Sequence, residues 1–126
     1  MNVIDSSGWL EYFAGGKNAG FFAPAVEQTA KLIVPSVSLL EVFKKILRES
    51  SESNALQAIA IMQAGRVIQL DATLAVVAAK LGHDLKLPLA DSIMYATSQV
   101  YKATLWTQDA DFKDLQGVRY TNKTCR

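Results

Sequence analysis

The chain has 126 residues, of which 50% are hydrophobic and 20% charged, and its formal net charge is +1. These values predict a single domain over residues 1–126 with its own core, and they exclude a nucleic-acid binder that relies on overall positive charge. The sequence has no apolar run of roughly 18 residues and no basic-then-apolar leader, so neither a membrane span nor a signal peptide is expected. Its single cysteine, Cys125, leaves no partner for an internal disulfide, which fits a reducing compartment and a cytoplasmic protein.

Short apolar runs along the chain predict strands. In chain order they are 2–4, 32–34, 67–70, 103–106 and 117–120. Apolar residues at helical spacing predict helices between these runs, the first beginning at Ser6 or Ser7 and the third at Ser36 or Ser38: 6–14, 21–28, 36–47, 55–64, 72–85 and 88–100. Because strands alternate with helices throughout, we expect a three-layer α/β/α sandwich with a mostly parallel central sheet.

The helix that begins at Pro88 carries an acidic residue in its first turn. Proline fits this position because its missing N–H has no partner there, and Asp91 meets the positive end of the helix dipole. Helix initiation alone therefore explains Asp91, and the alternative is a role in a site. The apolar residues of this helix are expected to face the core: Leu89, Ile93, Ala96 and Val100.

Three other features have plain structural explanations. Asp71 precedes a helical stripe and is expected to cap that helix. His83, the only histidine, lies among polar neighbours and is expected on the surface, with no general-base role. The Phe21-Phe22 pair fits either the core or a surface that faces a partner.

Five carboxylates fall where a parallel sheet would bring them together. Asp5, Asp109 and Asp111 each follow a predicted strand, while Glu41 and Asp91 lie near helix starts. With right-handed crossovers, strand ends and helix starts meet at one edge of the sheet, which is where ligands bind. We therefore expect an acidic site at this edge, although capping is an alternative explanation for Asp5 and Asp109.

The chemistry of this acidic set favours a hard metal ion. The chain offers no second histidine and no cysteine near these residues, and carboxylate oxygens suit Mg²⁺ or Mn²⁺. Such ions activate water and stabilise charge on a leaving oxygen, which predicts metal-assisted hydrolysis of a phosphodiester. The sequence has no Gly-x-x-x-x-Gly-Lys loop, so P-loop hydrolysis of nucleoside triphosphates is not supported.

Basic residues follow Glu41 along the same predicted helix. Lys44, Lys45 and Arg48 lie three, four and seven positions after it and share its side of the helix. They form either a solvent-exposed helix face with helix-stabilising ion pairs or a basic surface beside the acidic site.

Four segments carry acidic residues in a characteristic order. They are 2–10 with Asp5, 34–42 with Glu41, 89–96 with Asp91 and 107–112 with Asp109. With these elements between them, they resemble the four acidic motifs of PIN-domain nucleases, and specifically of VapC-type toxins from bacterial and archaeal toxin–antitoxin pairs. The third segment is the most specific, and the resemblance covers nearly the whole chain.

The resemblance implies roles for the acidic residues. Asp5, Glu41, Asp91 and Asp109 would hold Mg²⁺ or Mn²⁺, directly or through water, with Asp111 as a fifth acidic position. Two hydroxyl side chains would hydrogen-bond to these ligands: Ser6 and Thr107.

The resemblance also implies a metal-dependent endoribonuclease with RNA as substrate, a homodimer, and an antitoxin partner encoded alongside. In such an enzyme a bound water attacks the phosphorus. Basic residues would hold the RNA backbone and make binding salt-dependent: Lys44, Lys45, Arg48 and Arg119.

Two other functions fit the same residues less well. One is a non-catalytic module that acts through its antitoxin complex and operator binding, and the intact acidic set argues against it as the only role. The other is a phosphatase of the haloacid dehalogenase type, with Asp5 as nucleophile. That chemistry usually needs a second aspartate two residues later, where this chain has Ser7.

Overall fold

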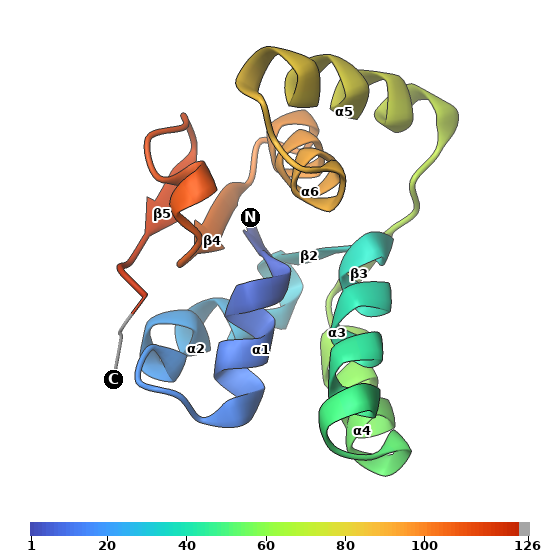
Figure 1. Cartoon of the computed structure of the whole chain (residues 1–126), viewed down its shortest axis with the longest axis vertical. Helices are drawn as coiled ribbons and strands as arrows, with labels where there is room; N and C mark the ends of the chain where they lie inside the picture. Colours follow the sequence, from blue (N-terminus) through green and yellow to red (C-terminus); the bar gives the residue numbers. More distant parts are fainter. Residues whose placement is uncertain (124–126) are drawn as a thin grey trace.

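A parallel sheet organises the molecule. The computed structural model describes residues 1–123, and Cys125 lies outside them. Five strands form one sheet in the order β3-β2-β1-β4-β5, and all neighbouring pairs are parallel (Figure 1). Their bounds are β1 (Asn2–Ile4), β2 (Leu32–Pro35), β3 (Arg66–Ile68), β4 (Thr104–Thr107) and β5 (Val118–Tyr120). Each predicted strand overlaps an observed one, and the predicted parallel sheet is confirmed.

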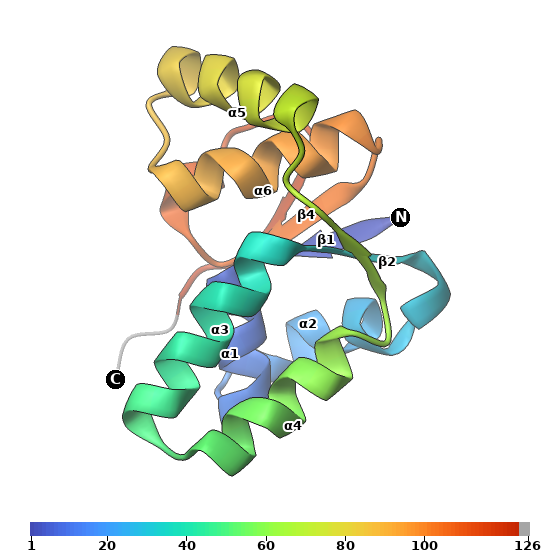
Figure 2. The ribbon, with the colours of Figure 1, turned by 90° about the vertical axis from the view of Figure 1, so that its right-hand side faces the viewer.

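Helices cover both faces of the sheet, as the predicted sandwich requires (Figure 2). On one side lie α5 (Ala72–Leu85) and α6 (Leu89–Val100). On the other side lie α1 (Ser6–Ala14), α2 (Ala19–Glu27), α3 (Ser36–Glu49) and α4 (Glu52–Met62). Two short 3-10 helices, η1 (Thr29–Lys31) and η2 (Ala110–Phe112), precede β2 and follow β4. None of the helices within residues 1–123 is long and apolar enough to cross a membrane.

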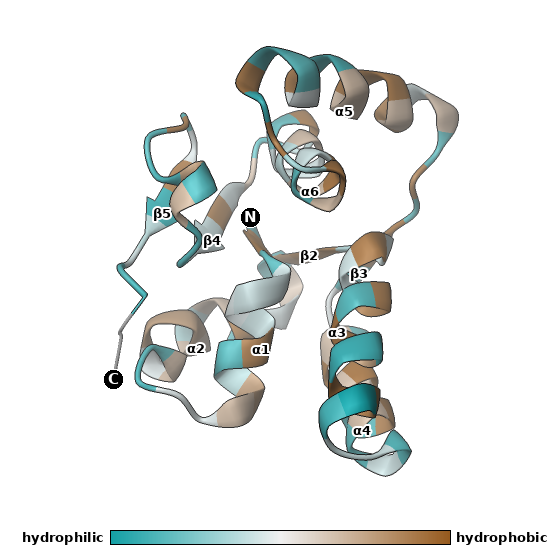
Figure 3. Ribbon diagram, viewed as in Figure 1, coloured by the Kyte–Doolittle hydropathy of each residue, from teal (hydrophilic) through white to brown (hydrophobic). Residues whose placement is uncertain are grey.

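Successive side chains of a strand face opposite sides, so the sheet separates two hydrophobic clusters. On the α5–α6 side, Val3 and Leu105 belong to a cluster with Ile93. On the other side, Ile4 and Trp106 pack in a second cluster with Val34 and Phe22. The strand β2, at the centre of the molecule, is hydrophobic along its length (Figure 3). Packing in these two clusters therefore fixes the positions of the strand ends and of the residues that follow the strands.

Aspartates cap both α1 and α5. Asp71 caps α5, accepting from the backbone N–H of Leu74, as predicted. At α1 the sequence offered Asp5 or a serine, Ser6 or Ser7, as the cap. Asp5 is the N-cap, and Ser6 is already the first helical residue. Gly15 ends α1 with a φ of 63°, a conformation that favours glycine.

The predicted core stripe of α6 is only half correct. Ile93 and Ala96 are buried, whereas Leu89 is 83% exposed and Val100 52% exposed. Leu89 and Val100 are the first and last residues of the helix, and both side chains lie outside the core. Between them all residues from 92 to 98 are buried, polar ones included, because this stretch is enclosed between the sheet and α5.

Two further expectations concern exposed and buried side chains. His83 lies on the surface, with its side chain 88% exposed, as predicted. Of the phenylalanine pair, Phe22 is fully buried in the core, while Phe21 is half-buried against Trp106. Phe22 is therefore a core residue, and it offers no surface to a partner.

Candidate metal centre

Asp5 combines two roles at the carboxyl end of β1. As N-cap of α1 it accepts from the N–H of Gly8 at 2.8 Å, and it also accepts from the hydroxyls of Ser7 at 3.1 Å and Thr107 at 2.6 Å. The side chain is buried, with 2% of the residue exposed. Burial raises the pKa of Asp5 to about 6, although its hydrogen bonds act in the opposite direction. Capping alone does not account for a carboxylate this deeply enclosed.

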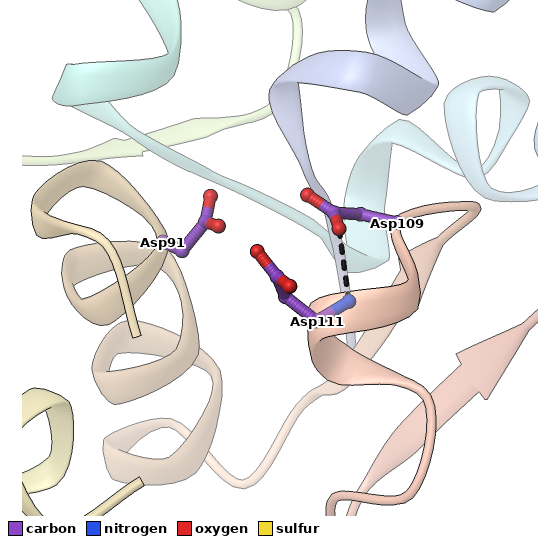
Figure 4. Close-up of side chains that lie close together, drawn as sticks. All are labelled: Asp91, Asp109 and Asp111. Atoms are coloured by element: carbon purple, nitrogen blue, oxygen red, sulfur yellow. Dashed lines mark hydrogen bonds between the residues drawn. The ribbon is translucent and has the colours of Figure 1, made fainter. Parts of the chain in front are cut away.

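Three aspartates meet beside it. Asp91 lies in the first turn of α6, and Asp109 and Asp111 lie in the turn that follows β4. Figure 4 shows their carboxylates pointing toward one another. Each offers one oxygen such that the three atoms lie within 4.8 Å of one another. The Asp109 carboxylate also accepts from the backbone N–H of Asp111 at 2.9 Å, which fixes the turn.

Electrostatics connects all five acidic residues. The pKa of Asp91 is raised to about 7, first by burial and then by the negative charges of Asp109, Asp5, Asp111 and Glu41. Within residues 1–123 none of these five carboxylates forms an ion pair. The structure thus brings together the residues that the sequence placed at one edge of the sheet, and it leaves their mutual repulsion uncompensated.

The two hydroxyl side chains named from the sequence both contact acidic residues. Ser6 donates to Glu41 Oε1 at 2.6 Å and so links the start of α1 to α3. Thr107 donates to Asp5 and accepts from the backbone N–H of Asp109 at 2.8 Å. Because one hydroxyl holds both sides of the site, the positions of Asp5 and Asp109 are coupled.

The donor set fits a hard divalent cation. It consists of carboxylate oxygens, which Mg²⁺ and Mn²⁺ prefer, and it carries negative charge that such a cation would neutralise. Burial is the main cause of the raised pKa values of Asp5 and Asp91, and the neighbouring carboxylates add to it, most clearly at Asp91.

Comparisons with known proteins agree with this arrangement. The sequence model of the PIN domain matches residues 3–118. The chain belongs to the PIN domain family.

Solved structures share the fold of this PIN domain at low sequence identity. A toxin-antitoxin complex from Klebsiella pneumoniae matches with a TM-score of 0.79 and 22% identity, over 94% of this chain and 96% of that chain. VapC20 from Mycobacterium tuberculosis, described as a toxin that cleaves the sarcin-ricin loop, matches with a TM-score of 0.77 and 20% identity, over 94% and 97%. VapBC2 from Rickettsia felis, bound to a DNA fragment from its promoter, matches with 0.73 and 12%, over 96% and 97%. No curated protein matches the sequence significantly.

The basic residues of this PIN domain are not gathered around the carboxylates. Lys45 pairs with Glu49 at 2.9 Å, and Arg48 approaches the same carboxylate at 3.8 Å. Lys44 is exposed and forms no ion pair within residues 1–123. Arg119 lies over the indole of Trp106, with its Cζ 4.5 Å from the ring centroid. Glu49, on the same helix, therefore neutralises part of the basic surface that was expected beside the acidic site.

A wide cleft begins next to the acidic residues. It has a volume of about 810 Å³ and is lined by residues of α1, α3 and α4. Ser7 and Gln108, the neighbours of Asp5 and Asp109, line it together with Lys45. The five carboxylates themselves do not line this cleft.

Gln108 is a residue of this site that sequence reasoning missed. It is 4% exposed, and its side-chain oxygen accepts from Asn18 at 2.8 Å. The same Asn18 amide donates to the backbone oxygen of Asn122 at 2.9 Å. Gln108 thus ties the loop after α1 to the turn that carries Asp109. The position of Gln108 between Thr107 and Asp109 was the only indication of its role in the sequence, because its partner Asn18 is distant in the chain.

Proposed function

We propose that this PIN domain is a Mg²⁺- or Mn²⁺-dependent endoribonuclease and the toxin of a type II toxin–antitoxin module. The observation that carries the proposal is the convergence of Asp91, Asp109 and Asp111, with oxygens within 4.8 Å, beside the buried Asp5. The fold it shares with a toxin-antitoxin complex and with VapC20 supports an RNA substrate and an antitoxin partner. We further propose that the chain acts in the cytoplasm, as one domain and as a homodimer.

In this proposal the acidic residues hold the metal: Asp5, Glu41, Asp91, Asp109 and, as a fifth position, Asp111. When bound, the ion would acidify a water molecule and stabilise charge on the leaving oxygen. Ser6 and Thr107 hold Glu41 and Asp5 in fixed orientations. Asp91 must lose its proton before it can act as a ligand, so its raised pKa predicts weaker activity below neutral pH.

Binding of RNA would involve the basic residues of α3 together with the edge strand. Lys44 is the best placed of them, since it is exposed and has no ion pair within residues 1–123. Lys45, Arg48 and Arg119 would contribute further phosphate contacts. Each contact releases counterions, so affinity should fall as salt rises.

The decisive experiment is cleavage of total cellular RNA by the purified, antitoxin-free protein. Reactions contain Mg²⁺, Mn²⁺ or a chelator, and RNA ends are mapped by sequencing. Discrete ends that require metal and disappear with Asp91→Asn are expected. Asp114→Asn is the matched control, because Asp114 is an exposed aspartate outside the cluster. Equal cleavage by folded Asp91→Asn would show that the site assignment is wrong.

A second candidate is a PIN module without catalysis that acts through an antitoxin complex bound to operator DNA. The observation in its favour is a solved structure of the same fold, VapBC2, bound to promoter DNA. A metal-loaded, folded sample that cuts no RNA, but shifts operator DNA when mixed with antitoxin, would favour this function.

A further inference from the structure

A pocket on the α2 side of the sheet has the properties of an anion site. It lies between α2, β1, β4 and β5 and has a volume of about 470 Å³. Asn2, Gln28 and Arg119 form its polar lining, while Phe21 and Trp106 contribute its aromatic wall. No acidic side chain of the described residues lines this pocket. Its charge is therefore set by Arg119.

Arg119 is exposed, and its side chain lies over an aromatic ring without a negative partner among the described residues. Its guanidinium lies 4.5 Å from the ring centroid of Trp106, and within residues 1–123 it forms no ion pair. Trp106 is itself fixed, since it is 8% exposed and its ring lies 5.3 Å from that of Phe21. A guanidinium that stacks on an indole keeps its N–H donors at the edge, where they can bind another group.

Asn2 adds neutral donors to the same pocket. Its side-chain oxygen accepts from the Trp106 indole N–H at 2.9 Å, which orients the amide. The amide nitrogen, Nδ2, donates to no atom of the described residues. A fixed cation beside amide donors, without a carboxylate, matches the oxygens of a phosphate group.

We propose that the pocket around Arg119, Trp106 and Asn2 binds a phosphate of the RNA backbone at a distance from the bond that is cut. This rests on the proposed endoribonuclease function. Trp106 packs in the cluster on the α2 side, whereas the side chain of the next residue, Thr107, points the other way and contacts Asp5 at the carboxyl end of the strands. The pocket and the acidic cluster share no lining residue among those described. RNA that occupies both must extend beyond the bond that is cut, so we expect a long or folded RNA as the preferred substrate.

The first test reads the pocket without any cleavage. The indole N–H of Trp106 is followed by ¹H–¹⁵N spectroscopy during titration with inorganic phosphate and with an RNA oligonucleotide, in chelator. The chain has two tryptophans, and the fully buried Trp9 is the internal control because it lies outside the pocket. Both ligands should shift the Trp106 signal and leave that of Trp9 in place. Arg119→Ala should abolish the shift.

The second test measures affinity for long, folded RNA and its salt dependence. Arg119→Ala should weaken binding about tenfold, since a charged hydrogen bond is lost. The slope of log affinity against log salt should fall by about 0.7 to 0.9, the effect of one phosphate contact. Arg66→Ala is the matched control, because Arg66 also stacks on an aromatic ring, Tyr101 at 5.5 Å, but on the strand at the opposite edge. It should change neither quantity.

Three other outcomes overturn the proposal, each in a distinct way. A phosphate-induced shift with unchanged RNA affinity means that the pocket takes free phosphate and not RNA. No shift with either ligand means that Arg119 only protects an edge strand from pairing with another chain. Equal losses in Arg66→Ala and Arg119→Ala mean a general charge effect. If the protein cuts no RNA while the spectroscopic shift persists, the nuclease proposal fails and the anion site stands.

Discussion

Both α1 and α5 begin with an aspartate N-cap, but the surroundings of the two aspartates differ. Asp5 and Asp71 each precede a helix, and each accepts from the backbone N–H three residues later at 2.8 Å. Asp71 is exposed, and the cap is its only side-chain hydrogen bond within the described residues. Asp5 is 2% exposed, accepts from two further hydroxyls and interacts electrostatically with Asp91 and Asp109.

The difference between the two caps shows that the position of the preceding strand in the sheet, and not the cap itself, decides whether an aspartate belongs to the site. The cap is a local interaction that any short polar side chain can form, and it says nothing about a site. What distinguishes Asp5 is its strand, which lies at the centre of the sheet and ends beside β4 and the start of α6. Asp71 follows β3, at an edge of the sheet, where no second strand end brings a carboxylate to it.

The largest expected effect separates the charge from the cap. Asn keeps the capping oxygen and removes the negative charge, so both Asp5→Asn and Asp71→Asn should fold. Asp5→Asn should lower metal-dependent cleavage of RNA at least about a hundredfold, because it loses a proposed metal ligand. Asp71→Asn should cleave at the wild-type rate. The comparison fails if both variants lose activity equally.

The comparison of Asp5 and Asp71 also shows how much of the fold and of the site can be predicted from the sequence. Alternation of strands and helices was enough to predict the sheet, its parallel strands and the edge at which Asp5, Asp91 and Asp109 would meet. That inference works because a parallel sheet with right-handed crossovers leaves few arrangements. It needs no knowledge of individual side-chain contacts.

What the sequence missed depends on contacts between distant segments. Gln108 gains its role from Asn18, 90 positions earlier in the chain, and nothing local indicates that pair. Leu89 follows the helical stripe, but it lies at the end of α6, beyond the layer that would bury it. Arg119 was expected only as a contact to the RNA backbone, and its place over the ring of Trp106 depends on a strand pairing that nothing local indicates.

The next prediction uses pH to sharpen the difference. In the folded protein the pKa of Asp5 is about 6 and that of Asp91 about 7, both above the value of 3.8 for an unperturbed carboxyl. A raised carboxyl pKa means that folding favours the protonated form, so metal-free protein should lose stability as pH rises from about 4 to 7. Asp91→Asn removes one such group. It should be more stable than wild type at pH 8, by roughly 1–2 kcal/mol after allowance for the partial exposure of Asp91.

Urea unfolding in chelator measures this effect. The advantage of Asp91→Asn should shrink as pH falls through the pKa of Asp91 and disappear near pH 4. Asp114→Asn, outside the cluster, should follow wild type at every pH. A variant less stable than wild type at pH 8 would show that Asp91 is stabilised by its surroundings and not repelled by them. Saturating Mg²⁺ should reverse the order, because the ion would bind wild type better.

The smallest effect tests the cap at α5 alone. Asp71→Ala removes the acceptor for the Leu74 N–H and should lower the free energy of unfolding by about 1 kcal/mol, while Asp71→Asn should be close to neutral. Urea unfolding at pH 7.5 checks both, and RNA cleavage by either variant should equal that of wild type when the protein is folded. A loss of activity in Asp71→Ala without a loss of stability would mean that the start of α5 contributes to the site, and the contrast with Asp5 would then be one of degree. Preserved activity with lowered stability would show that Asp71 serves only as a cap. Asp5 would then differ from it because neighbouring carboxylates make its cap part of an acidic centre.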